Sequence, residues 1–400
     1  MICGFAWEPK GTARSRAFPI AAELVRRGHR VTMFLTPYDN PKYSGLTEER
    51  HGVRIVNVNV GSAPGFKNVP SIVGKLRAAV RAESPDIVHV FKPKGYAGAA
   101  CAWLLLTGFR SLVLDCDDWE GWGGWNDVKS YPWAVKEYID RQEKWLMRRT
   151  PVVTVASREL QRRAESLRNS SKSVFYIPNC AGSPGSVAAQ REALSSNREA
   201  AKMSFGLPDV PVIFFSGHFD VKREIEFFSR TAIFAAKQTG AAIAIVGEGP
   251  ELTTMKEFFS HHPEVRAQFY PRLPYPRFVE LLAATDIAAF PYPDDPIYQA
   301  KCSARIVDYM SMGKAIISTS VGQNNDYITN QDSGILTQPG NEEAFIDALV
   351  TLIRDPELRA RLGRSAQRQL AEKFSWSGQP IETCLEAYEQ VSQGHLTRAN

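Results

Sequence analysis

Short hydrophobic runs alternate with amphipathic segments along the first half of the chain. Six runs have the length of buried strands: residues 30–36, 54–59, 86–91, 111–117, 152–157 and 174–178. Between them, hydrophobic residues recur at helical spacing, as in Phe18, Ile20, Ala21, Leu24 and Val25. Strands that alternate with helices predict a parallel sheet with helical crossovers.

The same alternation restarts in the second half. Strand-like runs lie at residues 212–216, 242–246, 265–270, 286–290, 314–318 and 334–337, and helical patterns follow at 342–354, 357–373 and 381–391. The stretch between the two halves is rich in Ser, Ala, Gly and Asn, and its one helical pattern covers residues 191–203. This composition is typical of a connection between domains.

A chain of 400 residues exceeds the size at which a single hydrophobic core keeps growing. We therefore predict an α/β fold of two Rossmann-like, doubly wound parallel-sheet domains that face a cleft. The expected parts are an N-terminal domain at 1–180, a linker at 181–210, a C-terminal domain at 211–378, and a last helix at 379–400 that packs back on the N-terminal domain. Ligands of such folds bind at the carboxyl ends of the strands, so the cleft is the expected active site.

Composition narrows the class of protein. The net charge is +5, but Lys and Arg are dispersed without an aromatic-interleaved basic tract, which argues against a nucleic-acid partner. The six cysteines are far apart and form no CxxC pair, so we expect neither a metal site nor a disulfide framework. No apolar stretch has the length of a membrane span, and no export signal is visible at the start. A cytoplasmic location is the expectation.

Two glycine turns follow strands of the second half. The first contains Gly217 and His218, with Lys222 and Arg223 at the start of the next helix. Backbone amides in such a turn and a nearby cation suit a diphosphate, although an ordinary turn with solvated basic residues fits equally well. The second turn, with Gly247 and Gly249, leads into a helix and is typical of a structural connector.

A short, well-delimited helix forms the third signal. Ser303 is a suitable N-cap, and Ile306, Val307 and Met310 give the helix one apolar face. The free amides near its start form an anion site, to which Lys301, Ala304 and Arg305 contribute backbone or charge. Asp308 lies off the apolar face, where it either binds ribose hydroxyls or is a solvated surface carboxylate.

These motifs together carry a family resemblance over nearly the whole chain. Their order and spacing resemble those of GT-B glycosyltransferases of family 4. The matching segments are Gly28–Thr32, Ile177–Asn179, the turn at Gly217, Val246–Pro250, Ala284–Ile287, Asp308–Ile317, Ser333–Leu336 and Phe374–Trp376.

The resemblance implies a transferase that moves a sugar from a nucleotide-sugar donor to an acceptor, with retention of configuration and without a metal or other cofactor. It implies that a basic residue at Lys222 or Arg223 clamps the diphosphate, and the family spacing from Gly217 favours Arg223. Amides near Ser303 to Arg305 would hold phosphate oxygens, and Asp308 would bind the ribose. The acceptor is expected to be a sugar, a lipid-linked compound or another small molecule.

Two positions depart from the family pattern. The first of the family's paired glutamates falls on Ala300, while the second is Asp308. The basic neighbour of the glycine turn is His218, which carries charge only below about pH 6.5 unless its environment changes this. These departures keep two alternatives open: a nucleotide-sugar epimerase of the same fold, and a non-catalytic protein that binds nucleotide sugars.

The N-terminal half offers fewer signals. Gly11 and Thr12 follow the first strand and resemble the family's glycine loop, which faces the donor. Asp117 and Asp118 end a strand where many relatives place a histidine, so we consider them as candidates for orienting or deprotonating the acceptor hydroxyl, against a structural loop role.

Two aromatic features also have a structural and a functional interpretation. Trp119, Trp122, Trp125 and Trp133 either stack on a sugar or anchor their loop in the core. Residues 136–149 form either an amphipathic helix that touches anionic lipid, which would place the protein on the cytoplasmic membrane face, or an ordinary surface helix.

Overall fold

Two sheets, each surrounded by helices, organise the chain. The structure is a computed structural model that describes residues 1–9, 11–61 and 65–396. Unit 1 contains residues 1–184, 300–302 and 375–400, and unit 2 contains residues 185–299 and 303–374.

The described strands of unit 1 form a sheet with one antiparallel edge. Its strand order is β3 (Thr47–Arg50), β4 (Val53–Asn57), β2 (Thr32–Leu35), β1 (Ile2–Cys3), β5 (Val88–Phe91), β6 (Leu112–Cys116), β7 (Val152–Val155) and β8 (Val174–Tyr176). All neighbours pair in parallel except β3 and β4. Phe91 of β5 pairs with Asp115 of β6, so the residues that follow these two strands emerge at the same edge.

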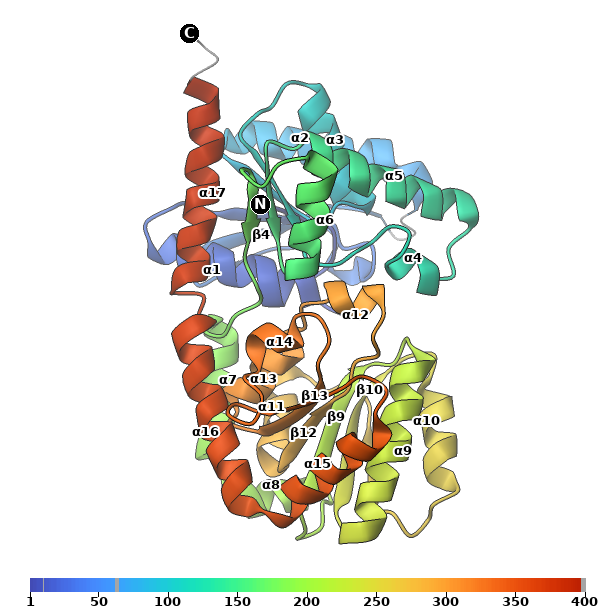
Figure 1. The fold of residues 1–400 in the computed structure, drawn as a ribbon. Coiled ribbons are helices and arrows are strands. Elements are labelled where there is room, and N and C mark those ends of the chain that lie inside the picture. The colour runs from blue at the N-terminus through green and yellow to red at the C-terminus, as the bar shows by residue number, and fades with distance from the viewer. Residues whose placement is uncertain (10, 62–64, 397–400) are drawn as a thin grey trace. The chain divides into compact units, whose positions relative to one another are not determined.

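Helices cover both faces of this sheet (Figure 1). One face packs against α2 (Val69–Glu83), α3 (Gly95–Leu106), α5 (Trp133–Arg149) and α6 (Arg158–Arg168). On the other face lie α1 (Phe18–Arg26) and α17 (Gln379–Leu396), whose Ala387 and Val391 pack on Val113 and Val152. The remaining helical segments are η1 (Thr12–Ala17), η2 (Pro41–Tyr43), η3 (Phe66–Asn68) and α4 (Trp125–Val128).

The described strands of unit 2 all pair in parallel. Their order is β11 (Ala267–Tyr270), β10 (Ala242–Glu248), β9 (Val212–His218), β12 (Ile287–Phe290), β13 (Ala315–Thr319) and β14 (Ile335–Thr337). One face is covered by α9 (Lys222–Thr239), α10 (Leu252–Ser260) and α15 (Glu342–Arg354). On the other face, α11 (Tyr275–Ala284) and α13 (Ala304–Ser311) pack on Phe214 through Phe278 and Tyr309. The other helices are α7 (Pro184–Ser195), α8 (Arg198–Ser204), α12 (Pro296–Ala300), α14 (Asn324–Tyr327) and α16 (Pro356–Lys373).

The predicted fold class of two doubly wound α/β domains is confirmed by this architecture. The boundaries differ in detail: residues 181–210, expected to be a linker, contain helices α7 and α8, and almost all of them belong to unit 2. The terminal helix α17 belongs to unit 1, where Glu382 forms an ion pair with Arg27 of 2.6 Å. The sequence pattern missed β3, because its residues Thr47 to Arg50 are polar.

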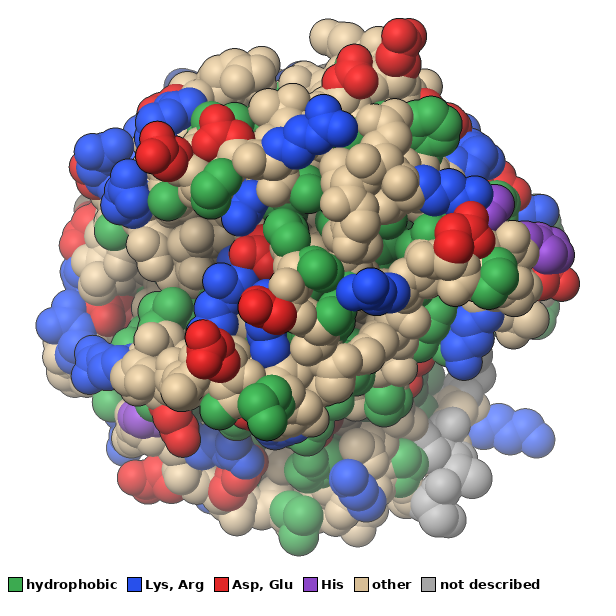
Figure 2. Space-filling view, turned by 90° about the horizontal axis from the view of Figure 1, so that it is seen from below, with side chains coloured by type: hydrophobic (Ala, Val, Ile, Leu, Met, Phe, Trp, Pro, Cys, Tyr) green, Lys and Arg blue, Asp and Glu red, His purple; other side chains and the backbone are tan. Residues whose placement is uncertain are grey.

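Surface charges of the two signs are intermixed. On the face that Figure 2 shows, Lys and Arg side chains alternate with Asp and Glu side chains. Of the helices in the described part of the chain, none is long and apolar enough to cross a membrane.

Candidate functional site

A half-buried arginine, Arg305, lies beside the first glycine turn of unit 2. Gly217 is near the carboxyl end of β9, and a Cβ atom at this position would overlap Nη1 of Arg305. Arg305 comes from the first turn of α13, and its guanidinium lies 5.2 Å from the ring centroid of Phe290. Nη1 has no hydrogen-bond partner among the described residues. A side chain at position 217 would therefore displace this guanidinium from its present place.

The environment of Arg305 keeps it charged. Burial by itself lowers the pKa of the guanidinium, but Tyr292, Tyr309 and Glu224 raise it above its ordinary value. A guanidinium with a buried nitrogen that lacks a hydrogen-bonded acceptor is suited to an anionic ligand.

Lys222 and Arg223, the predicted diphosphate clamp, point toward solvent. Their side chains are 62% and 67% exposed. Lys222 lies 3.6 Å from Glu226, and Arg223 lies 3.0 Å from Asp295. The structure does not bring either residue to Arg305.

The inward-facing residue of this helical turn is Glu224. Its carboxylate is buried and accepts a hydrogen bond from the hydroxyl of Tyr298. Sequence reasoning missed both residues, because adjacent positions of a helix point about 100° apart and the sequence does not show which of them faces inward. His218, the other residue of the turn, lies 3.1 Å from Asp220 and has an exposed side chain.

The second glycine turn packs directly on the first. Gly217 pairs with Gly247 in the sheet, and a Cβ at Gly247 would overlap the carbonyl of Gly217. Gly249 has φ of +149°, and a Cβ there would collide with the backbone of Phe219. This close approach of two backbones supports the interpretation of Gly247 and Gly249 as a structural connector.

The start of α13 has the expected N-cap. The hydroxyl of Ser303 accepts a hydrogen bond of 3.3 Å from the amide of Arg305, and Ala304 is the first helical residue. Ser303, Ala304 and Arg305 therefore lie together with Gly217 at the carboxyl ends of the unit 2 strands.

Asp308, one turn further along α13, is held by two neighbouring helices. Its Oδ1 accepts hydrogen bonds from Tyr275 of α11 at 2.7 Å and from Gln190 of α7 at 3.3 Å. Gln190 also donates to the hydroxyl of Tyr275 at 2.9 Å. Burial and the neighbouring carboxylate raise the pKa of Tyr275. Asp308 is thus an oriented carboxylate rather than a freely solvated one.

Residues 300–302 belong to unit 1, although the segments on either side belong to unit 2. Ser157 donates a hydrogen bond of 2.6 Å to the carbonyl of Ala300, and Asn179 donates one of 2.7 Å to the carbonyl of Cys302. The Nζ atom of Lys301 lies 5.4 Å from the ring centroid of Trp125. The contribution of Lys301 to the anion site of α13 stays a prediction.

The predicted carboxylates of unit 1 lie in a cluster around Lys92. The Nζ atom of Lys92 is 2.9 Å from Asp117 and 3.0 Å from Glu120, and it forms an ion pair with Asp118. Lys94 pairs with the other oxygen of Glu120. Burial by itself raises the pKa of Glu120, but Lys92 and Lys94 lower it to about 2.

Gly11 and Thr12, the predicted donor residues of unit 1, lie beside this cluster. Thr12 donates a hydrogen bond of 3.2 Å to Asp117, and it is the first residue of η1. Gly11 precedes η1 with φ of −79°, a conformation that any residue adopts. Sequence reasoning missed Lys92, Lys94 and Glu120. The signal was available, because the strand at 86–91 is followed by two lysines and the next strand by three carboxylates.

Four residues near the cluster form a buried network. Arg16 donates to both oxygens of Asp115 at 2.6 and 2.7 Å and to Asn179 at 3.3 Å. Asn179 in turn holds the carbonyl of Cys302. This network ties η1, β6 and the end of β8 together beneath Asp117.

The tryptophans of the loop after β6 mainly anchor that loop. Trp119 packs on the unit 1 core with Arg163 over its ring, at 4.1 Å from the centroid. Trp122 donates a hydrogen bond of 3.1 Å to Glu137. Trp133 differs, because 69% of its surface is exposed.

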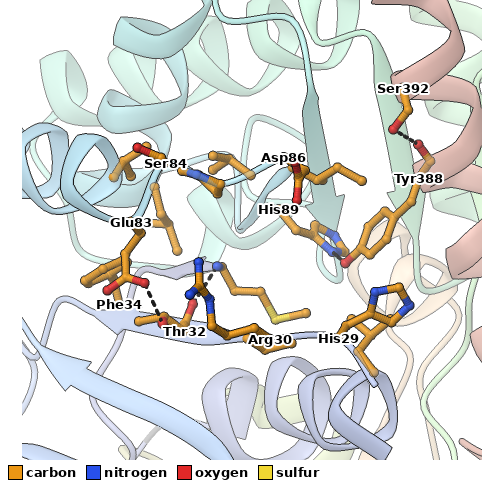
Figure 3. Close-up of a pocket in the computed structure, with 18 of the residues that line it drawn as sticks. His29, Arg30, Thr32, Phe34, Glu83, Ser84, Asp86, His89, Tyr388 and Ser392 are labelled. Atoms are coloured by element: carbon orange, nitrogen blue, oxygen red, sulfur yellow. Dashed lines mark hydrogen bonds between the residues drawn. The ribbon is translucent and has the colours of Figure 1, made fainter. Parts of the chain in front are cut away.

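A pocket of about 860 Å³ lies at the opposite edge of the unit 1 sheet, at the amino ends of β2 and β5. Figure 3 shows His29, Arg30, His89 and Tyr388 around it, and the hydroxyl of Tyr388 lies 2.9 Å from Nδ1 of His89. None of the predicted site residues lines this pocket. Among the described side chains, no group of three or more His, Cys, Asp or Glu is arranged to hold a metal ion.

Both halves of the chain match glycosyltransferase families. Residues 11–180 match the family described as "Glycosyl transferase 4-like domain", and residues 210–355 match "Glycosyl transferases group 1". A sulfoquinovosyl transferase of Arabidopsis thaliana is 22% identical over 372 residues, which cover 86% of this chain and 65% of that protein. The chain therefore spans just under two thirds of that relative. The N-acetyl-alpha-D-glucosaminyl L-malate synthase of Bacillus anthracis is 23% identical over 363 residues, which cover 89% of this chain and 88% of the relative.

Solved structures show the same fold. Sucrose-phosphate synthase from Thermosynechococcus elongatus superimposes with a TM-score of 0.74 at 18% identity and covers 98% of this chain and 99% of its own. The Anabaena protein HepE in complex with UDP-glucose has a TM-score of 0.68 at 15% identity. The match covers 99% of this chain and 98% of the HepE chain. Two α/β units with these family matches and these structural neighbours are diagnostic, and the chain belongs to the glycosyltransferases of the group 1 type with the GT-B fold.

Proposed function

We propose that unit 2 binds the nucleoside diphosphate of a nucleotide-sugar donor through Arg305. The observation that carries this proposal is the half-buried Arg305 beside Gly217, whose buried Nη1 atom has no hydrogen-bond partner among the described residues. Arginine can bind two phosphate oxygens at once, and the amino end of α13 adds the favourable end of a helix dipole. The similar fold of HepE in complex with UDP-glucose supports a donor of this class.

Asp308 completes the proposed donor site. Tyr275 and Gln190 both donate to its Oδ1, which orients the carboxylate to accept hydrogen bonds from the ribose hydroxyls. Arg305 and Asp308 lie three positions apart on α13, so they are neighbours along the surface of one helix.

A binding panel with two matched variants tests the donor site. We expect one of UDP, GDP, ADP and TDP to raise the melting temperature of the wild-type protein, because a ligand of the native state stabilises it. Arg305→Met should lose at least tenfold in affinity by calorimetry, since a charge-assisted contact is removed. Arg223→Met, which removes an exposed cation of the same domain, should bind like the wild type.

The opposite pattern would overturn the assignment. If Arg223→Met lost affinity and Arg305→Met kept it, the exposed arginine would be the diphosphate clamp. If no diphosphate stabilised the wild-type protein, the donor proposal itself would fail.

We further propose that Asp117 and Asp118 act on the acceptor hydroxyl. They lie at the carboxyl edge of the unit 1 sheet, and their side chains are partly exposed. In Asp117→Asn, turnover should fall about 10²-fold while donor affinity stays unchanged, because a general base is lost without change of size. Near-normal turnover would return Asp117 to a structural role.

Retention of configuration and independence of metal ions belong to the same proposal. A cationic guanidinium and a helix amino end can stabilise the departing diphosphate in place of a divalent ion. Turnover should therefore persist in EDTA, and the anomeric configuration of the product is read by proton NMR. Purified protein that binds the donor but never transfers or hydrolyses it would favour the non-catalytic alternative.

A peripheral contact with the cytoplasmic membrane face is favoured by one surface feature. Tyr131, Trp133 and Tyr138 are exposed around the start of α5, and tryptophan and tyrosine are typical of membrane interfaces. Vesicles of phosphatidylglycerol should co-sediment with the wild-type protein and less with Trp133→Ser. Equal sedimentation of both, or none with the wild type, would remove this contact.

A further inference from the structure

Lys92 has an unusual backbone conformation for its residue type. It directly follows β5, precedes Pro93 and has φ of +77°, in the left-handed region that favours glycine. Its side chain is only 5% exposed. A long side chain held in this conformation costs free energy, so the surrounding contacts must hold it there.

Those contacts are three carboxylates that all come from one short segment. The ammonium lies 2.9 Å from Oδ1 of Asp117 and 3.0 Å from Oε1 of Glu120, and it also pairs with Asp118. Strands β5 and β6 are neighbours, and Lys92 and Asp117 follow their carboxyl ends. The left-handed backbone at Lys92 directs its side chain along this end of the sheet toward Asp117. Lys94, two residues later, reaches only Glu120.

Exposure divides the cluster into an inner and an outer part. Lys92 and Glu120 are 5% and 2% exposed, whereas Asp117 and Asp118 are 12% and 26% exposed. Burial raises the pKa of Asp118, and the charge of Lys92 opposes this effect. Burial alone would lower the pKa of Lys92, but the carboxylates raise it well above its ordinary value, so the ammonium persists. Asp118 is thus the most exposed acid of the cluster, Oδ1 of Asp117 is buried against Lys92, and the cation lies beneath both.

We infer that Lys92 is a positioning residue of the acceptor site: it fixes the places of Asp117 and Asp118 and puts a positive charge beneath the more exposed Asp118. This inference rests on the proposed action of Asp117 on the acceptor hydroxyl. Lys92 acts through the carboxylates and does not touch the substrate. Thr12, which donates to the second oxygen of Asp117, fixes the rotation of that carboxylate.

The test compares two lysines of one cluster. Lys92→Met removes the shared cation, and Lys94→Met removes a cation that contacts Glu120 alone. The carboxyl carbon of Asp118 is titrated by NMR in the full chain labelled with [γ-¹³C]aspartate, and release of UDP from UDP-glucose is measured across the same pH range.

In Lys92→Met the pKa of Asp118 should rise by about 1 to 3, because the opposite charge within 4 Å is gone. The acidic limb of the pH profile of kcat should move to higher pH by a similar amount. Lys94→Met should leave the Asp118 titration and the profile close to those of the wild type. In Lys92→Arg, which keeps the charge, the acidic limb should stay within about 0.5 of its wild-type position.

Two results would overturn the inference. One is an unchanged titration of Asp118 in folded Lys92→Met. The other is a raised pKa of Asp118 with an unmoved pH profile, which would make Lys92 purely structural. If Lys92→Met does not fold, the Lys92→Arg variant is used instead. Arginine keeps the positive charge, so a shift of the acidic limb of its kcat profile would contradict the proposed role.

Failure of the proposed function gives a different pattern. If the wild-type protein binds none of UDP, GDP, ADP and TDP, the donor proposal is at fault, and the Asp118 titration alone still decides whether Lys92 controls the carboxylates.

Discussion

The side chain of Ala300 lies in the core of unit 1, where the family pattern has its first glutamate. The methyl group is fully buried among residues such as Cys116 and Val155, and the carbonyl is held by Ser157. A glutamate side chain at this position would have no room and no contact with solvent. Alanine therefore fits the local packing. Another residue must do what the family's first glutamate does, or this chain lacks that function.

Ala300→Glu is accordingly expected to destabilise the protein without raising turnover. Burying an unpaired carboxylate and overfilling the core should cost about 3 kcal/mol of unfolding free energy. Urea unfolding of Ala300→Glu and of the small polar control Ala300→Ser measures this difference. A Glu variant as stable as the wild type, with faster transfer, would show that position 300 faces the substrate.

At the residue scale the local structure at the start of α13 was easier to predict from the sequence than the side-chain directions at the start of α9. Ser303, Arg305 and Asp308 carry a local signal, because an N-cap and an apolar face define how the helix lies. Lys222 and Arg223 were selected by proximity to a glycine turn, and packing turns both side chains toward solvent while Glu224 points inward. Their contact with the diphosphate stays a prediction. Lys92 was missed because its role depends on a left-handed turn and on pairing between strands.

Individual elements are stabilised by contacts that sequence periodicity does not reveal. Helix α11 ends at Ala284, and the ammonium of Lys314 donates hydrogen bonds of 2.9 Å to the carbonyl of Ala283 and 2.8 Å to that of Thr285. Burial, with Arg198 nearby, lowers the pKa of Lys314 from 10.5 to about 7. This lysine caps a helix from inside the protein and loses its proton far more easily than a solvated one.

The pH dependence of stability should reveal this lysine. Between pH 7 and 10.5 the unfolded chain holds the Lys314 proton, whereas the folded chain has released it. The unfolding free energy therefore rises with pH over this range, and the gain is lost as the pH falls toward 7. Relative to Lys314→Met, the unfolding free energy of the wild type should grow by about 3 kcal/mol from pH 7 to 9.5. If urea unfolding gave the same difference in unfolding free energy between the two proteins at both pH values, the folded protein would keep the Lys314 proton.

The periodicity of the sequence predicted most strands because parallel strands are buried on both faces and appear as continuous apolar runs. Strand β3 has no such run, since it is an antiparallel edge of Thr, Glu, Glu and Arg. Helices α7 and α8 were taken for a linker because their small and polar residues give a weak pattern, although Gln190 of α7 holds Asp308.

At the scale of the whole molecule, unit 1 is discontinuous in sequence. Residues 1–184 need α17, because Ala387 and Val391 complete the packing on Val113 and Val152. Trp376 also donates a hydrogen bond of 2.9 Å to Ala181. Unit 2 lies entirely within residues 185–374, a range that also contains residues 300–302 of unit 1.

Separate fragments should therefore behave differently. The fragment 185–374 should fold by itself and show a cooperative thermal transition by circular dichroism, because it contains all strands of its sheet. The fragment 1–184 should lack such a transition until the peptide 375–400 is added. A cooperative transition of 1–184 alone would show that α17 is dispensable for unit 1.

The discontinuity also sets an order of events during synthesis. A ribosome completes unit 2 when residue 374 leaves the exit tunnel, whereas unit 1, whose strands are made first, lacks α17 until residues 379–396 have also emerged. Domains of nascent chains usually fold from the amino end onward. In this chain the first unit to be translated is the last that can finish folding, and its uncovered sheet face is a natural binding site for a chaperone during that interval.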